Sequence, residues 1–288
     1  MSSPRETSRL FTVVVPTYGR AESLRRCLAA LAAQTLPPSE WNLIVVDDGG
    51  REDLTPVIAE VRETVQVDLL RQPHSGPAAA RNAGAAAATG RYLAFTDDDC
   101  APAPGWLAAF AAGFERFPED MLGGSIVNGV RGNAYSEVSQ ALVSYLYDYY
   151  NGNGTVRFLT SNNIAMPLDR FRSLGGFSRG FPLAAAEDRD FCERWLNAGH
   201  RMTFVPDAVV EHHHDLRFRT FWQQHFNYGR GARRFHRARA RLERDGLRVE
   251  PLRFYLGLLN YPFAQWRFTS ALNRAALTAI TQVANAAG

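Results

Sequence analysis

The amino-acid sequence predicts an α/β protein with a mixed, mainly parallel sheet flanked by helices. Short apolar runs alternate with helical segments through residues 10–95, which is the pattern of successive right-handed βαβ units. Two of the apolar runs end in aspartate clusters, at the carboxyl ends where parallel sheets bind ligands. The chain has 288 residues, of which 46% are hydrophobic, so a sizeable core can form.

The predicted strands are unbroken apolar runs, which suit strands that are buried on both faces. They are expected at residues 10–15, 43–46, 67–70 and 92–95. Helices are expected between them, at residues 22–33, 53–63 and 77–90. In the third helix, Ser75 is the expected N-cap, Pro77 stands in the first turn and Gly90 ends the helix.

The rest of the chain divides at about residue 216. Residues 123–166 have mixed character, 187–199 are expected to be helical, and 201–210 to form a short strand pair. From there the chain is rich in arginine and then in aromatic residues. The expected domains are a catalytic domain at 8–215, with halves at 8–100 and 101–215, and a helical C-terminal extension at 216–288.

The composition excludes several kinds of chemistry. The net charge of +3 is too small to indicate a nucleic-acid partner, and the chain contains no lysine, which excludes a P-loop lysine or a Schiff base. Three cysteines stand far apart, which favours a reducing compartment. The first residues lack the apolar core of a signal peptide, and no run of 18 apolar residues predicts a spanning helix.

Asp97, Asp98 and Asp99 form the main candidate site. Three adjacent carboxylates repel each other, so the folded state needs a cation, and oxygen ligands suit Mg²⁺ or Mn²⁺. On an extended segment Asp97 and Asp99 point to the same side and could share one ion, while Asp98 points away. The alternative is a solvated acidic turn.

Six motifs in order resemble glycosyltransferase family 2, which has the GT-A fold. They are V-V-V-P-T-Y-G-R at 13–20, V-V-D-D-G at 45–49, A-R-N-x-G…T-D-D-D at 80–99, S-N-N-I-A-M at 161–166, L-G-G-F at 174–177 and E-D-R-D-F at 187–191. The resemblance covers about residues 10–236. It implies a GT-A type, Rossmann-like sheet and an inverting, metal-dependent glycosyltransferase. Gly19 departs from the family, which usually has asparagine there.

The resemblance also implies roles for individual residues. Pro16 and Thr17 would lie beside the nucleotide base, Asp48 would contact the base, and Asp47 would brace its loop. Asp97 would contact the ribose or the water shell of the metal, with Asp98 counted among the donor-binding residues. Asp99 would ligate the metal, His212 would be a further ligand, and Asp188 would be the general base.

Asp188 can also be assessed from its helix. It shares one helical stripe with Phe191, Cys192 and Trp195, so it is expected to face an apolar wall that raises its pKa, as suits a base. The alternative is that Asp188 only caps the helix. Glu187 is expected to orient the acceptor hydroxyl or the base.

Two further basic sites keep alternatives open. Arg81 could neutralise donor phosphate or merely pair with Asp47. The triplet His212–His214 could supply a metal ligand, with His212 and His214 on one side of an extended chain, or could be a polar strand end.

The expected reaction moves a sugar from a nucleotide-sugar donor, most simply a UDP-sugar, to a saccharide or lipid-linked hydroxyl acceptor, in cell-envelope polysaccharide or glycolipid synthesis. The expected location is cytoplasmic, with peripheral contact at the inner face of the membrane through the aromatic and arginine-rich residues 251–271. Alternatively, those aromatics cover the catalytic domain or a partner subunit. Two rival functions are a sugar nucleotidyltransferase and a basic nucleic-acid or anionic-lipid binding module, the latter because residues 217–248 hold ten arginines.

Overall fold

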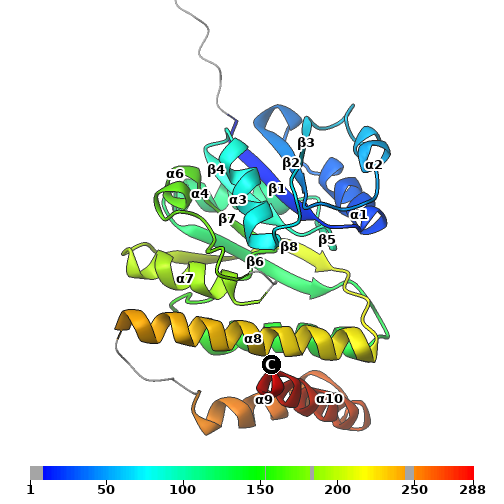
Figure 1. Ribbon diagram of the computed structural model, residues 1–288, viewed down its shortest axis with the longest axis vertical. Coiled ribbons are helices and arrows are strands. Elements are labelled where there is room, and N and C mark those ends of the chain that lie inside the picture. The colour runs from blue at the N-terminus through cyan, green and yellow to red at the C-terminus, as the bar shows by residue number, and fades with distance from the viewer. Residues whose placement is uncertain (1–8, 153, 182–184, 244–249) are drawn as a thin grey trace, which may run out of the picture.

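The computed structural model describes residues 9–152, 154–181, 185–243 and 250–288 (Figure 1). Its centre is an eight-stranded sheet with the order β3-β2-β1-β4-β7-β6-β8-β5. The strands are β1 (Phe11–Thr17), β2 (Trp41–Asp47), β3 (Val67–Arg71), β4 (Tyr92–Thr96), β5 (Cys100–Pro102), β6 (Met121–Asn128), β7 (Asn163–Pro167) and β8 (Met202–His212).

The predicted mixed, mainly parallel sheet is confirmed. Strand β1 is parallel to both β2 and β4, and β2 is parallel to β3. Strand β6 is parallel to β8. Strands β7 and β5 run antiparallel to their partners. The four predicted apolar runs are strands, and their ends lie within two residues of the expected bounds.

Helices cover both faces of the sheet. One face packs against α1 (Ala21–Ala32), α2 (Thr55–Ala59) and α4 (Trp106–Arg116), while the other packs against α3 (Pro77–Ala87), α6 (Leu168–Ser173) and α7 (Glu187–Asn197). A short 3₁₀ turn, η1 (Pro38–Glu40), precedes β2. Gly84 lets α3 approach the sheet closely, because a Cβ there would lie 2.4 Å from Val14 Cγ1.

A layer of helices lies beyond the sheet (Figure 1). It consists of α8 (Phe218–Glu243), α9 (Leu252–Gln265) and α10 (Phe268–Ala287), together with α5 (Ala134–Asn151) from the middle of the chain. Val138 of α5 packs against Leu216, Phe221 and Leu277, which joins this layer into a small core of its own. Among the described residues, no helix is both long and apolar enough to cross a bilayer.

Three local expectations were wrong. The helix expected at 53–63 is limited to α2 and continues as turns. Gly76, with φ +90°, occupies the N-cap position of α3, while the Ser75 hydroxyl donates to the Pro73 carbonyl. The pair expected at 201–210 is the single strand β8, because the chain bulges between Val205 and Val210 and then resumes its pairing with β6 in the same direction.

Candidate active site

The predicted donor-binding residues meet at the carboxyl ends of β1, β2 and β4. Thr17 ends β1, Asp48 follows β2, and Asp97 follows β4. Pro16 lies within β1, opposite Val46 of β2. Because neighbouring parallel strands end at the same edge, Thr17 and Asp98 come into contact there although they are 81 positions apart in the chain.

The three adjacent aspartates point to different partners. Asp98 is fully buried, where it accepts a 2.6 Å hydrogen bond from the Thr17 hydroxyl and pairs with the Arg20 guanidinium. The same guanidinium donates at 2.9 Å to Asp99 Oδ2. Asp97 accepts at 2.6 Å from Arg81 Nη2. In this structure the two arginines therefore supply compensating positive charge to all three aspartates.

Burial and neighbouring charge act differently on these carboxyl groups. Burial raises the pKa of Asp98 to about 7, although Arg20 opposes the rise. Burial alone would also raise the pKa of Asp99, but His212 and Arg20 outweigh it and hold that pKa well below its usual range. Asp99 thus stays ionised, as a cation ligand must.

Pairing between β5 and β8 brings His212 to Asp99. Cys100 lies opposite His212 in the register, and the His213 amide donates at 2.7 Å to the Asp99 carbonyl. His212 Nε2 is 3.5 Å from Asp99 Oδ1. Burial would lower the pKa of His212, but Asp99 raises it. The centroid of the His214 ring lies 4.0 Å from that of His212, with the rings tilted by 41°, and burial and His212 lower the pKa of His214 to about 3.

Within the part of the chain that the structure describes, one group of side chains could hold a cation. Ligand atoms of Asp99, Cys100 and His212 all lie within 4.8 Å of one another. A carboxylate oxygen and an imidazole nitrogen suit Mn²⁺, whereas burial raises the pKa of the Cys100 thiol and so disfavours the thiolate. Asp97 is engaged by Arg81 and lies outside this group, so one ion shared by Asp97 and Asp99 stays a prediction.

The Asp48 carboxylate organises the loop that follows β3. It accepts hydrogen bonds from the Gln72 side chain and from the backbone amides of Ser75 and Gly76, at 2.6 to 2.9 Å. Asp47 accepts at 2.8 Å from the Gly50 amide and so ties down its own turn. The same loop carries His74, whose ring stacks on that of Tyr18.

Arg81 connects the two halves of the site. Its side chain is buried, with Nη2 at Asp97 and Nη1 at 3.2 Å from Glu187 Oε1. The alternative pairing with Asp47 is wrong, because Arg81 points to Asp97 and Glu187 instead. Asp97 follows β4 and Glu187 begins α7, so the guanidinium of Arg81 links an acid at a strand end to an acid at the start of α7.

The start of α7 presents two acids in an apolar setting. The predicted stripe is confirmed, since Phe191, Cys192 and Trp195 are buried. Ala186, with φ +70°, is the N-cap residue, and the Asp188 carboxylate accepts a 2.8 Å hydrogen bond from the Arg189 amide in the first turn of the helix, so the roles of base and cap for Asp188 both stay predictions. Burial raises the pKa of Asp188, and burial together with Asp188 raises that of Glu187 to about 7.

The sequence interpretation assigned no role to two features of this site. Arg20 ends the motif V-V-V-P-T-Y-G-R and contacts two of the three aspartates, a contact that no spacing rule could have indicated. Tyr18 and His74 stack at 4.2 Å, and the two side chains are each about half exposed, at 52% for Tyr18 and 56% for His74. An exposed ring pair beside the Asp48 loop offers a flat apolar surface.

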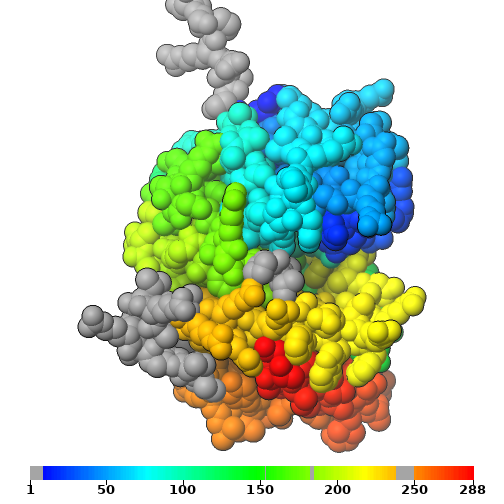
Figure 2. All heavy atoms as spheres, in the orientation of Figure 1, coloured from blue at the N-terminus to red at the C-terminus, as the bar shows by residue number. Residues whose placement is uncertain are grey.

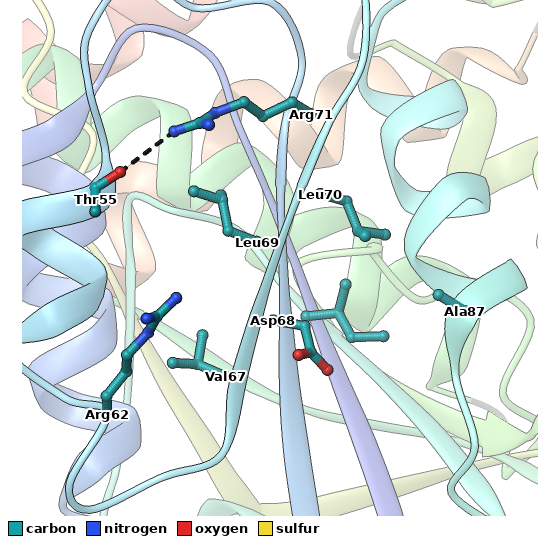
Figure 3. Close-up of a pocket in the computed structure, with 9 residues that line it drawn as sticks. Thr55, Arg62, Val67, Asp68, Leu69, Leu70, Arg71 and Ala87 are labelled. Carbon is teal, nitrogen blue, oxygen red and sulfur yellow. Dashed lines mark hydrogen bonds between the residues drawn. The ribbon is translucent and has the colours of Figure 1, made fainter.

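A separate groove runs along the outer edge of the sheet. Figure 3 shows that Val67, Asp68 and Arg71 of β3 line it together with Arg62. Strands β2 and β1 separate β3 from β4, which the aspartate triplet follows. None of the predicted site residues lines this groove, so it is not part of the candidate active site.

The fold and this strand-end site are typical of nucleotide-binding α/β proteins. The chain belongs to glycosyl transferase family 2, whose family model matches residues 12–173. This membership favours sugar transfer over the nucleotidyltransferase and the basic binding module as the function.

Two curated relatives and one solved structure are similar to this chain. The pre-mycofactocin glycosyltransferase of Mycobacterium tuberculosis is 33% identical over 229 residues, which cover 77% of this chain and 46% of that protein. Glycosyltransferase AglE of Haloferax volcanii is 25% identical over 229 residues, 76% of this chain and 72% of AglE. The chain thus spans about half the length of the first of these relatives.

The solved structure is a mannosyltransferase from Pyrobaculum calidifontis in complex with GDP-mannose and Mn²⁺. It superimposes with a TM-score of 0.63 at 22% identity, covering 98% of this chain and 77% of that one. This likeness confirms the GT-A type of fold.

Proposed function

We propose that this protein is an inverting, metal-dependent glycosyltransferase that moves a sugar from a nucleotide-sugar donor to a hydroxyl acceptor. The observation that carries the proposal is the link through Arg81, because it joins the Asp97–Asp99 cluster to Glu187 and Asp188 at one edge of the sheet. A donor held beside the Asp97–Asp99 cluster would place its anomeric carbon toward Glu187 and Asp188.

The donor side uses the residues around β1 and β2. Tyr18 and His74 give a stacking surface for a nucleobase, and the loop that Asp48 holds in place shapes its edge. Thr17 keeps Asp98 in its buried position, which orients the neighbouring Asp97 and Asp99. Relatives of this fold take different donors, GDP-mannose among them, so we propose a nucleotide sugar, with a UDP-sugar as the first to test.

Asp99 and His212 would hold the Mg²⁺ or Mn²⁺ ion, and Asp97 would contact it directly or through water. When bound, the ion would stabilise the negative charge that grows on the departing nucleoside diphosphate. Arg20 donates to Asp99 Oδ2 and is half exposed, so it can turn toward a donor phosphate once a cation takes over Asp99.

Asp188 is proposed as the general base on the acceptor side. Burial raises the pKa of Asp188, which makes its carboxylate a better proton acceptor than that of an exposed aspartate. Asp188 would take the proton of the acceptor hydroxyl as that oxygen attacks the anomeric carbon. Glu187, held by Arg81, orients this end of α7. Attack opposite the leaving group inverts the configuration, and no covalent intermediate forms.

For the acceptor we propose a saccharide or a lipid-linked sugar in the synthesis of cell-envelope polysaccharide or glycolipid. We further propose that the protein works at the cytoplasmic face of the membrane as a peripheral protein. The support is the apolar surface of the C-terminal helices, which would bring the site to a lipid-linked acceptor.

The experiment that tests the function is a thermal-stability screen. UDP-, GDP-, ADP- and dTDP-sugars are added to the chain with Mn²⁺, with Mg²⁺ and with a chelator. One donor class should raise the melting temperature only when the divalent ion is present. If no nucleotide sugar stabilises the chain under any condition, the proposed donor site is wrong.

A further inference from the structure

The helices α9 and α10 each bury one face in the C-terminal layer. Phe254 and Leu258 of α9 pack against Tyr145 of α5, whose hydroxyl donates at 2.7 Å to the Phe254 carbonyl. On α10, Leu277 packs into the core that Phe221 of α8 completes. Some of the C-terminal aromatics therefore do cover another part of the protein, as the second of the two alternatives for this segment expected.

The opposite face of α9 is apolar and exposed. Large side chains recur along it at intervals of four, three and four residues, so they form a single stripe. They are Leu252, 72% exposed, Leu256, 52%, Leu259, 36%, and Phe263, 39%. A helix that faces water would carry polar residues at these positions, so the stripe requires an explanation.

The exposed face of α10 continues this stripe. Phe268 is 70% exposed, Leu272 51% and Val283 59%, with exposed alanines at 276 and 279 between them at helical spacing. The rings of Phe263 and Phe268 lie 6.0 Å apart, so the two stripes meet where α9 passes into α10. We call the seven side chains Leu252, Leu256, Leu259, Phe263, Phe268, Leu272 and Val283 the outer face.

The charged side chains that α9 and α10 themselves carry all have one sign; of the nearby acids, Asp148 of α5 accepts a hydrogen bond from Tyr261, and Glu250, just before α9, pairs with Arg189. Residues 251–288 contain no aspartate or glutamate, and their charged residues are Arg253, Arg267 and Arg274. Arg274 pairs with Glu137 and covers Trp266, whereas Arg253 and Arg267 are exposed at the two ends of α9. An apolar stripe with cations at its margins is complementary to an anionic lipid surface.

We propose that the outer face is a docking surface for an anionic bilayer. The aliphatic and phenyl side chains enter the boundary of the acyl chains, while Arg253 and Arg267 reach the lipid phosphates. The helices lie in the plane of the membrane. The absence of aspartate and glutamate side chains from residues 251–288 favours a lipid over a protein partner, since a protein surface imposes no such restriction.

This docking surface specifies the membrane contact that the proposed function includes. It rests on the proposed function only for the reason that the protein binds a membrane. Figures 1 and 2 show α9 and α10, in orange and red, at the end of the molecule opposite the strands β1 to β3. Helix α8 lies between this end and the sheet, and α7, which packs on the sheet, stands next above α8 in this view. A membrane at the outer face would therefore be on the acceptor side of the molecule.

The test is flotation of the full chain with vesicles of equal parts phosphatidylglycerol and phosphatidylcholine, at low and high salt. The native chain should float at low salt and bind pure phosphatidylcholine vesicles less tightly. Replacing both arginines, R253Q with R267Q, should weaken binding to the anionic vesicles by roughly twentyfold, since each contributes roughly fivefold. The double change Leu256→Asp with Phe263→Asp should weaken binding by roughly a hundredfold or more.

A matched control uses two exposed apolar residues on strands β6 and β8. Val127 is 43% exposed and Phe204 38%, so Val127→Asp with Phe204→Asp adds the same charge elsewhere and should leave vesicle binding intact. Circular dichroism and melting temperature establish that both double variants are folded. Sedimentation of each chain without vesicles gives its oligomeric state.

Three results would overturn the proposal. The native chain could fail to float at low salt, or the variant with aspartates at 256 and 263 could float as well as the native chain. The native chain could also be a dimer that this variant dissociates, which would make the outer face an interface between two copies. Because the proposed function is tested separately, by thermal stabilisation with nucleotide sugars in the absence of vesicles, failure of the docking surface is distinguishable from failure of the proposed function.

Discussion

Replacement of Arg81 by methionine is the sharpest test of how the site is held together. The side chain of Arg81 is 3% exposed and that of Glu187 is 4% exposed, and the two are 3.2 Å apart. Methionine fills much of the same volume without the charge. Removing one partner of a buried ion pair costs about 3–5 kcal/mol, because the other charge stays buried without compensation.

The loss should depend on pH. The folded-state pKa of Glu187 is about 7, above its ordinary value of 4.5, so the contribution of this group to stability is present at low pH and is lost as the pH rises through 7. Without Arg81 the pKa of Glu187 rises further, so the free energy of unfolding of the variant continues to fall above pH 7, where that of the native chain no longer does. The variant should therefore be destabilised more at pH 8 than at pH 6, by on the order of 1 kcal/mol.

The assay is urea unfolding of both chains at the two pH values. The control is Arg25→Met, which removes an exposed arginine that pairs with Glu22 and Glu60 on the surface. This control should leave the free energy of unfolding nearly unchanged at both pH values. If Arg81→Met behaves like the control, or if its loss is equal at pH 6 and pH 8, Arg81 does not stabilise Glu187 as described.

Three further predictions concern individual side chains of the site. Asp188→Asn keeps the shape and removes the base, so turnover should fall by roughly 10²–10⁴-fold with donor affinity unchanged; a collapse of donor binding in a titration would instead make Asp188 a donor contact. Because burial raises the pKa of Asp188, the acid limb of the native pH–rate profile should lie above the range of an exposed aspartate, and a limb near pH 4 would contradict this. Thr17→Val removes the 2.6 Å hydrogen bond to buried Asp98 and should lower the free energy of unfolding by about 1–3 kcal/mol in urea, whereas no change would mean that Arg20 alone suffices.

The sequence predicts the sheet well because burial on both faces leaves a direct trace in the residues. The runs at β1, β2 and β4 contain almost only apolar side chains, so their position and their parallel order follow from the chain itself. The same rule places Asp48 and Asp97 at one edge. Strand β8 was misread as two strands because Pro206 and Asp207 interrupt its pattern, and only the partner strand β6 shows that the pairing resumes.

The partners of charged side chains could not be predicted in the same way. Arg81 and Arg20 come from different elements, and each contacts an aspartate of the triplet through its long, flexible side chain. Which carboxylate an arginine reaches depends on how closely its helix or loop approaches the sheet. For α3 that approach depends on Gly84, whose lack of a side chain gives no indication of a charge pair three residues away.

Release of the nucleoside diphosphate from the stabilising nucleotide sugar tests the account most directly. The rate is measured for the native chain with Mn²⁺, with excess chelator, and for Asp99→Ala with Mn²⁺. The account predicts release that requires the divalent ion and is lost in Asp99→Ala, since Asp99 and His212 would hold that ion. Release at the full rate in excess chelator, or by Asp99→Ala, would contradict it.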